Sequence, residues 1–219
     1  MHRPSKTRKT LGVSLIELVI SVGLFSIILL SLGKVVNASY NQYWESVGSL
    51  DVQKAVLYGT RLLIEDLTYT NSGAVETSQA QVQVQGLGQQ GQGQNVSMSR
   101  VVFPTPDDLN GNPSFSSRGQ LLWQSYTGYY VAPIGNTQAL FRSRSAIPIP
   151  GLIVPIPSEN GVTPDTMASI PGAKLILSDI SEFDLSREGA DIIKIRMSGY
   201  FQQRGLFTIV VENQVLPRN

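Results

Sequence analysis

The most constraining feature of this chain is an apolar stretch at residues 13–33, in which Glu17 is the only charged residue. A helix of about 21 residues, rising ~1.5 Å per residue, is long enough to cross the ~30 Å hydrocarbon core of a bilayer. We therefore expect this stretch to be a transmembrane helix. Four basic residues precede it, and by the positive-inside rule they stay in the cytoplasm while the rest of the chain is exported. They are Arg3, Lys6, Arg8 and Lys9.

Glu17 lies near the edge of this stretch and is a costly residue there, because charged side chains are disfavoured in a bilayer, by about 2.5 to 3.5 kcal/mol at its centre on insertion scales. Such a carboxylate needs a partner of opposite charge. A free α-amine on another copy of the same segment meets that need. The position of Glu17 therefore predicts a role in the assembly of several subunits.

The run at residues 12–18 resembles the N-terminal signature of type IV prepilins and type II secretion pseudopilins. In that family a membrane-embedded prepilin peptidase cuts after the glycine and methylates the new N-terminus, and the glutamate meets the terminal amine of a neighbouring subunit. The resemblance implies that Gly12 precedes the cut, that Val13 is the N-methylated first residue and that Glu17 is the assembly carboxylate. Val13 stands where most members carry phenylalanine or methionine, while Gly12 and Glu17 keep the family spacing.

A conventional secretory signal is the second interpretation of the same segment, because it also has a basic start and an apolar middle. Val36, Asn37 and Ala38 would then form a small-residue cleavage site. A glutamate inside the apolar region and a glycine just before it are atypical of such signals, so the sequence favours the prepilin interpretation.

Composition excludes several classes of function. The 219 residues, 42% of them hydrophobic, suffice for a membrane helix and one domain of ordinary size. The chain has no cysteine, and its one histidine, His2, lies in the leader. The processed chain would lack the thiol and imidazole groups of zinc sites, serine–histidine triads and cysteine nucleophiles, so we expect no enzyme, no cofactor and no metal. Loss of the four basic leader residues changes the net charge from +1 to −3, which leaves no overall positive field for nucleic acid.

Helical periodicity continues beyond Gly33 and predicts one helix over residues 13–69, ended by the stop signal at 71–73. Apolar residues recur on one side of its second half and predict that this half lies on a sheet. They are Tyr43, Val47, Leu50, Val56, Leu57, Leu63, Ile64 and Leu67.

From Val75 the period changes to two, which is typical of strands. We expect a hairpin with a glutamine- and glycine-rich tip at 86–94, an aromatic strand or hairpin at 119–133 bending at Gly128, and a strand at 139–144. A proline-rich surface excursion follows at 147–171. Further strands are expected within 174–185, 192–200 and 206–211.

These patterns predict an α+β fold that is pilin-like: a long N-terminal helix, with a membrane half and an amphipathic half, packed on an antiparallel β-sheet. The expected organisation is a basic leader at 1–12, a transmembrane and assembly helix at 13–36, and an exported domain at 37–219. Short segments of that domain look like the larger minor pilins of the PilW kind and the J-type minor pseudopilins. These segments are 62–67, 101–103, 119–123, 129–130, 140–142 and 217–219.

The resemblance implies a minor type IV pilin, a structural subunit that primes pilus assembly or lies at the pilus tip. Such a subunit would support twitching motility, adhesion or DNA uptake. The alternative within the family is a minor pseudopilin of a type II secretion system. Expected partners are other pilins or pseudopilins, the prepilin peptidase and the bacterial inner membrane, from which the subunit moves into the pilus or pseudopilus.

Three other sites have candidate residues. Asp108 and Asn110 alternate as calcium ligands do, but the sixth position lacks glycine and the twelfth lacks glutamate, which favours a plain turn. An exported binding or carboxylate-based enzyme domain would use an acidic cluster, although alternating carboxylates near turns are usually solvated. That cluster is Asp179, Glu182, Asp184, Glu188 and Asp191. Nucleic acid would be bound through Arg142, Arg144, Arg196 and Arg204.

Overall fold

The computed structural model describes residues 14–84, 94–188, 192–202 and 206–215. It divides into two compact units, Met1–Ser46 and Val47–Asn219. The leader and the predicted cleavage residues, Gly12 and Val13, lie outside the described residues.

The helix α1 runs without interruption over Leu15–Thr68 and confirms the prediction of a single long helix. Its first turn is capped by Ser14, whose side-chain oxygen accepts a hydrogen bond of 3.2 Å from the backbone N–H of Glu17. At the other end, Asn71 accepts a bond of 2.7 Å from the N–H of Gly73 and caps the short 3₁₀ helix η1, Ser72–Ala74. The stop signal read from the sequence therefore ends α1 as expected.

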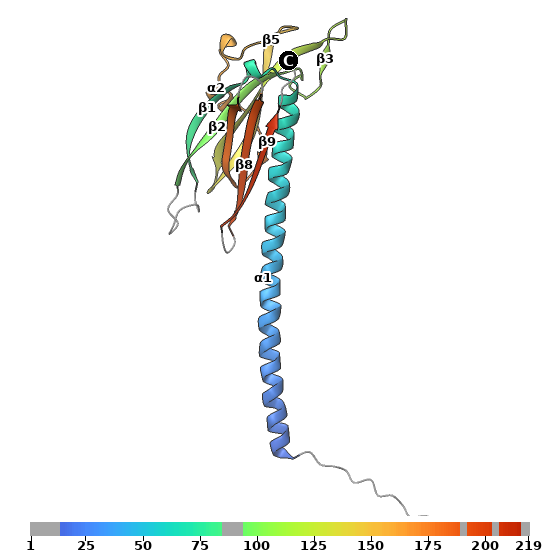
Figure 1. The fold of residues 1–219 in the computed structure, drawn as a ribbon, viewed down its shortest axis with the longest axis vertical. Coiled ribbons are helices and arrows are strands. Elements are labelled where there is room, and N and C mark those ends of the chain that lie inside the picture. The colour runs from blue at the N-terminus through green and yellow to red at the C-terminus, as the bar shows by residue number, and fades with distance from the viewer. Residues whose placement is uncertain (1–13, 85–93, 189–191, 203–205, 216–219) are drawn as a thin grey trace, which may run out of the picture. The chain divides into compact units, whose positions relative to one another are not determined.

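The strands form two antiparallel sheets (Figure 1). The first sheet has the order β1-β2-β4-β5-β6, with β3 paired to β4; the second has the order β7-β8-β9. The strands of the first sheet are β1 Glu76–Val84, β2 Gln94–Thr105, β3 Ser114–Phe115, β4 Leu121–Ile134, β5 Thr137–Gly151 and β6 Lys174–Leu177. Those of the second are β7 Ile180–Glu188, β8 Ile192–Gln202 and β9 Leu206–Val215. The α+β class is confirmed, and the single sheet expected from the sequence is divided into two.

The aromatic segment is one long strand and not a hairpin. β4 pairs with β5 continuously through Gly128, which lies opposite Ser143, and its only irregularity falls between Trp123 and Ser125. Gly128 is explained by packing: a methyl group there would lie 2.8 Å from Cβ of Met167. The glycine admits a close neighbour and makes no turn.

The proline-rich region contains regular elements, in keeping with the ordered form of the predicted excursion. Its first residues belong to β5, and it later forms the 3₁₀ helix η3, Ser158–Asn160, and the short helix α2, Pro164–Ala168. Thr163 and Thr166 close a reciprocal capping box at the start of α2. Met167 of α2 is fully buried in a small core on the outer face of the first sheet, together with Val102, Trp123, Tyr126 and Ile147.

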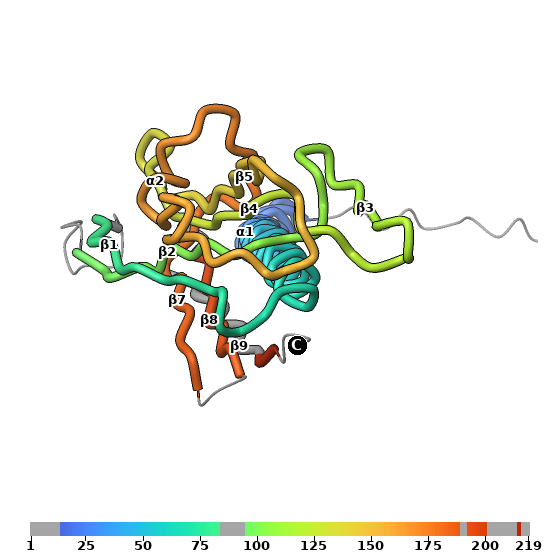
Figure 2. The backbone as a smooth tube through the Cα atoms, turned by 90° about the horizontal axis from the view of Figure 1, so that it is seen from above, coloured from blue at the N-terminus to red at the C-terminus, as the bar shows by residue number. Residues whose placement is uncertain are grey.

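The C-terminal half of α1 packs against both sheets, as the end-on view in Figure 2 shows. Val56, Leu63 and Leu67 are fully buried in the main core. A methyl group on Gly59 would lie 3.4 Å from the sulfur of Met197 in β8 and 3.9 Å from Leu140 in β5. This half of the helix therefore fills the space where the two sheets meet.

Candidate assembly site and pockets

The apolar part of α1 exposes its side chains. All large apolar residues between Leu15 and Val36 are at least half exposed. α1 is also long and apolar enough to cross a membrane, with a mean hydropathy of 2.5 over its most apolar 18 residues. Contact of such a large apolar surface with water is unfavourable, so lipid or other apolar helices must cover it.

The polar residues within this part fall into two groups. The hydroxyls of Ser21, Ser26 and Ser31 donate to backbone carbonyls four residues earlier, at 2.8, 2.8 and 2.9 Å. These serines are satisfied within the helix and suit an apolar medium. Glu17 differs, because within the described part of the chain its carboxylate has no hydrogen bond and no ion pair.

A buried ionic network joins α1 to the first sheet. Asp66 of α1 is 7% exposed. Its Oδ2 accepts a hydrogen bond of 2.5 Å from the hydroxyl of Tyr129 in β4, and its Oδ1 accepts one of 2.6 Å from Nη2 of Arg142 in β5. One helix residue therefore fixes α1 to two neighbouring strands.

The electrostatics of this network follow from its burial. Burial raises the pKa of Asp66 above its usual value, although the charge of Arg142 and the bond from Tyr129 act in the opposite direction. Burial, followed by the charge of Asp66, raises the pKa of Tyr129 well above 10.0, so this hydroxyl stays a donor at neutral pH. Asp66 lies well beyond the exposed apolar part of α1, and it is buried in the second unit.

The network borders a pocket of about 480 Å³. Arg144 also faces this pocket, where its Nη2 lies 3.1 Å from Oδ2 of Asp107 and its Nη1 donates to the carbonyl of Asp108 at 2.9 Å. The two arginines are therefore paired with acidic residues inside the fold, which leaves no excess positive charge here for a bound anion.

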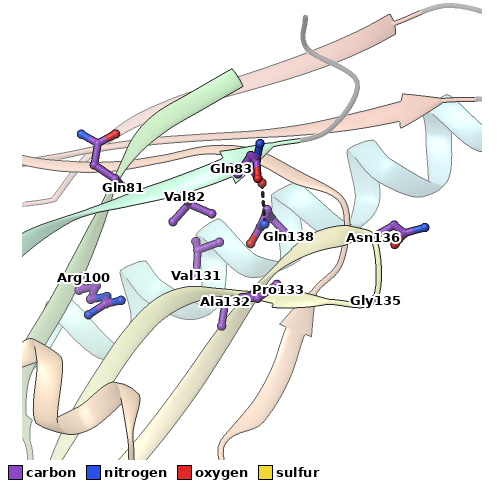
Figure 3. Close-up of a pocket in the computed structure, with 10 residues that line it drawn as sticks. All are labelled: Gln81, Val82, Gln83, Arg100, Val131, Ala132, Pro133, Gly135, Asn136 and Gln138. Carbon is purple, nitrogen blue, oxygen red and sulfur yellow. Dashed lines mark hydrogen bonds between the residues drawn. The ribbon is translucent and has the colours of Figure 1, made fainter. Parts of the chain in front are cut away.

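A second pocket, of about 390 Å³, lies between β1 and the turn that joins β4 to β5 (Figure 3). Val82 and Val131 meet at its base, and both pack on the main core. Gln138 is 7% exposed and donates from Nε2 to the carbonyl of Gln83 at 2.8 Å. Its Oε1 has no partner within the described part of the protein. The lining is rich in side-chain amides and also includes Arg100, which pairs with Asp165 at 2.7 Å.

The structure separates the candidate residues for nucleic acid. Arg142 and Arg144 lie on one face of β5, as predicted, but their partners are Asp66 and Asp107. Arg196 of β8 pairs with Glu182 at 3.3 Å. Arg204 lies outside the described residues. The three described candidates, Arg142, Arg144 and Arg196, therefore form ion pairs within the chain and do not form a shared basic patch.

The other two candidate sites have structural explanations. Asp108 forms a turn, because its Oδ1 accepts from the N–H groups of Asn110 and Asn112 at 2.8 and 2.9 Å. These bonds lower the pKa of Asp108. In the acidic cluster, Asp184 accepts a bond of 2.9 Å from Ser99 and so links β7 to β2, while Asp191 lies outside the described residues. Among the described residues, no group of acidic side chains is arranged to hold a metal ion.

Sequence reasoning missed the network of Asp66, Tyr129 and Arg142. One signal for it was available: Asp66 lies between Leu63 and Leu67 on the apolar face of the helix. A carboxylate on a buried face requires a partner, but nothing in the pattern shows that Tyr129 supplies one.

The chain matches no protein-family model, no curated protein and no solved structure. Its likeness to pilins is therefore one of architecture and rests on its own features. These are a 54-residue N-terminal helix, apolar in its first half, and antiparallel sheets packed against its second half. That is a pilin-like architecture.

Proposed function

We propose that this protein is a minor type IV pilin, a structural subunit whose chemistry is assembly. The observation that carries the proposal is the carboxylate of Glu17, which has no partner among the described residues. It lies in the exposed apolar half of a helix whose other half is packed on a pilin-like domain. An apolar helix of this kind is inserted in the inner membrane first and packs against other helices after assembly.

The proposed sequence of events begins with cleavage by the prepilin peptidase between Gly12 and Val13, followed by methylation of the Val13 amine. Glu17 then pairs with the terminal amine of a neighbouring subunit. In the low-dielectric core of a filament an unpaired carboxylate is strongly disfavoured, so this pairing selects the axial register of the two helices. Packing of the apolar side chains supplies most of the association energy.

Size and surface support a place at the tip or in priming. Ile149 and Ile153 are 84% and 87% exposed at the end of β5 and in the loop that follows. An irregular apolar loop of this kind would not pack well between the repeated subunits of a pilus shaft. It suits a position that only a few copies occupy. The pairing of Arg142 and Arg144 within the fold gives DNA uptake no direct support.

The experiment compares Glu17→Gln with wild type in the native host. Glu17→Gln keeps the shape of the side chain and removes its charge. We expect normal export and cleavage but reduced co-purification with pilus filaments. Glu45→Gln is the matched control, because Glu45 is an exposed glutamate on the same helix. Equal incorporation of Glu17→Gln and Glu45→Gln would contradict the proposal, and co-purification with a secretion pseudopilus would favour the pseudopilin alternative.

A further inference from the structure

Three exposed aromatic residues follow the apolar part of α1 on adjacent turns. Tyr40, Tyr43 and Trp44 are 60%, 62% and 46% exposed. The ring of Trp44 packs edge to face against both tyrosine rings, with centroids 6.0 Å from Tyr40 and 5.9 Å from Tyr43. Edge-to-face packing holds the three rings as one surface, which we call the aromatic patch.

The level of this patch along α1 follows from helix geometry. Tyr40 lies four residues, or about 6 Å, beyond Val36, where the exposed apolar residues of the span end. Long side chains in a helix lean toward its N-terminus, so the ring of Trp44 covers the turn that contains Tyr40. All three rings therefore gather within a few ångströms of the end of the apolar part.

The chemistry of the patch suits one environment in particular. Tyrosine and tryptophan combine an apolar ring with a polar group, and they are enriched at the level of lipid headgroups. Between Lys34 and Glu45 the chain has no charged residue, so nothing opposes contact with the bilayer surface. Lys34 can place its ammonium group in the headgroup region while its aliphatic carbons stay in the hydrocarbon.

We propose that the aromatic patch binds the lipid headgroup region at the outer face of the membrane and sets the depth of α1 before assembly. The proposal rests on the proposed function, since it requires α1 to be a membrane helix. From Tyr40 back to Glu17 is 23 residues, or about 35 Å of helix. With Tyr40 just outside a hydrocarbon core of about 30 Å, Glu17 reaches the opposite interface, where a carboxylate costs less than at the centre.

The test uses the full chain in phosphatidylcholine vesicles whose lipids carry bromine either near the glycerol backbone or near the chain ends. The chain has two tryptophans, and Trp123 is buried. The difference between wild type and Trp44→Phe therefore isolates the fluorescence of Trp44. We expect a larger loss of this fluorescence with bromine near the glycerol backbone than with bromine near the chain ends.

Two other outcomes overturn the inference. Stronger quenching near the chain ends would place the rings inside the hydrocarbon. Quenching by neither lipid, in a chain that resists alkaline extraction, would place the patch above the membrane and favour contact with another subunit, while the membrane helix itself stands. A chain that alkali extracts would contradict both this inference and the proposed function.

A variant series checks the depth-setting role. Tyr40→Ser with Tyr43→Ser removes two anchors and keeps Trp44 as the probe, so quenching of Trp44 by bromine near the glycerol backbone should fall. Tyr58→Ser is the control, because Tyr58 is an exposed tyrosine of the same helix beyond the patch. Unchanged quenching in the double variant would show that the aromatic residues do not set the depth.

Discussion

The hydroxyl of Tyr129 lies 2.5 Å from Oδ2 of Asp66, a hydrogen bond between residues 63 positions apart in the chain. It joins the helix to β4, the middle strand of the first sheet, and both side chains are buried. Because Arg142 binds the other oxygen of the same carboxylate, Asp66 is the point at which α1, β4 and β5 are held together.

We expect the folded domain to be independent of the apolar part of the helix. A truncated chain that begins at Tyr40 keeps all residues of the main core, which start at Val52. It should be soluble and monomeric, with a circular dichroism spectrum of mixed helix and strand. A predominantly helical spectrum would contradict the α+β assignment in solution. The three stability measurements below use this truncated chain.

Tyr129→Phe should destabilise the domain by about 1.5 to 3 kcal/mol, because it removes a donor from a buried charged acceptor. Urea unfolding measures the change. Tyr130→Phe is the matched control on the same strand, since the Tyr130 hydroxyl has no hydrogen bond among the described residues while its ring stacks on Phe141 at 5.5 Å. The control should stay within about 0.5 kcal/mol of wild type. Equal losses would contradict the prediction, because the hydroxyl bonded to Asp66 would then contribute no more than one without a hydrogen bond.

The pH dependence of stability should carry the signature of Asp66. Its folded pKa is raised above the usual 3.8, so the folded state holds this proton more tightly than the unfolded state does. The stabilisation is complete below pH 3.8 and is lost as the pH rises through the folded pKa. Asp66→Asn does not titrate, so wild type should lose stability relative to this variant as the pH rises through that window. Urea unfolding at several pH values measures the difference, and the opposite trend would mean that Arg142 outweighs burial.

Gly199→Ala should destabilise the domain by about 1 to 3 kcal/mol through overpacking. A methyl group at Gly199 in β8 would lie 2.8 Å from Cγ1 of Val52 and 2.9 Å from Cγ2 of Val56. Both valines are β-branched helix residues with little freedom to move aside. At Gly151 the nearest atom would be 4.0 Å away, so Gly151→Ala is the control and should be tolerated. A neutral Gly199→Ala would show that the helix can shift away from β8.

Processing can be checked by the intact mass of the native protein. The mature chain should begin at methylated Val13, and Gly12→Asp should retain the leader, because the peptidase requires the glycine in the family that this segment resembles. A mature chain that begins at Ser39 would instead establish the conventional signal interpretation. Detection of unmethylated Val13 would confirm the cut and correct only the modification.

Much of the local structure was predictable from the sequence. The extent of α1, its end at Thr68 just before the stop signal at 71–73 and the strand positions follow from periodicities and capping residues that act over a few positions. Glu17 was also recognisable, because a lone carboxylate in an apolar run is informative without any tertiary context. The role of Gly128 was not, because a glycine for a turn and a glycine for close packing look the same in a sequence.

The tertiary structure decided how those elements combine. β6 and β7 are separated by two residues, yet they belong to different sheets, and only the assembled fold shows that α1 fills the space between them. The partners of Asp66 depend on which strands lie beside the helix, and strand order is set by contacts among distant residues. Periodicity reports which face of an element is buried but not what buries it. The charge at Glu17 could therefore be read from the sequence, whereas the pairing of Asp66 with Tyr129 and Arg142 required the fold.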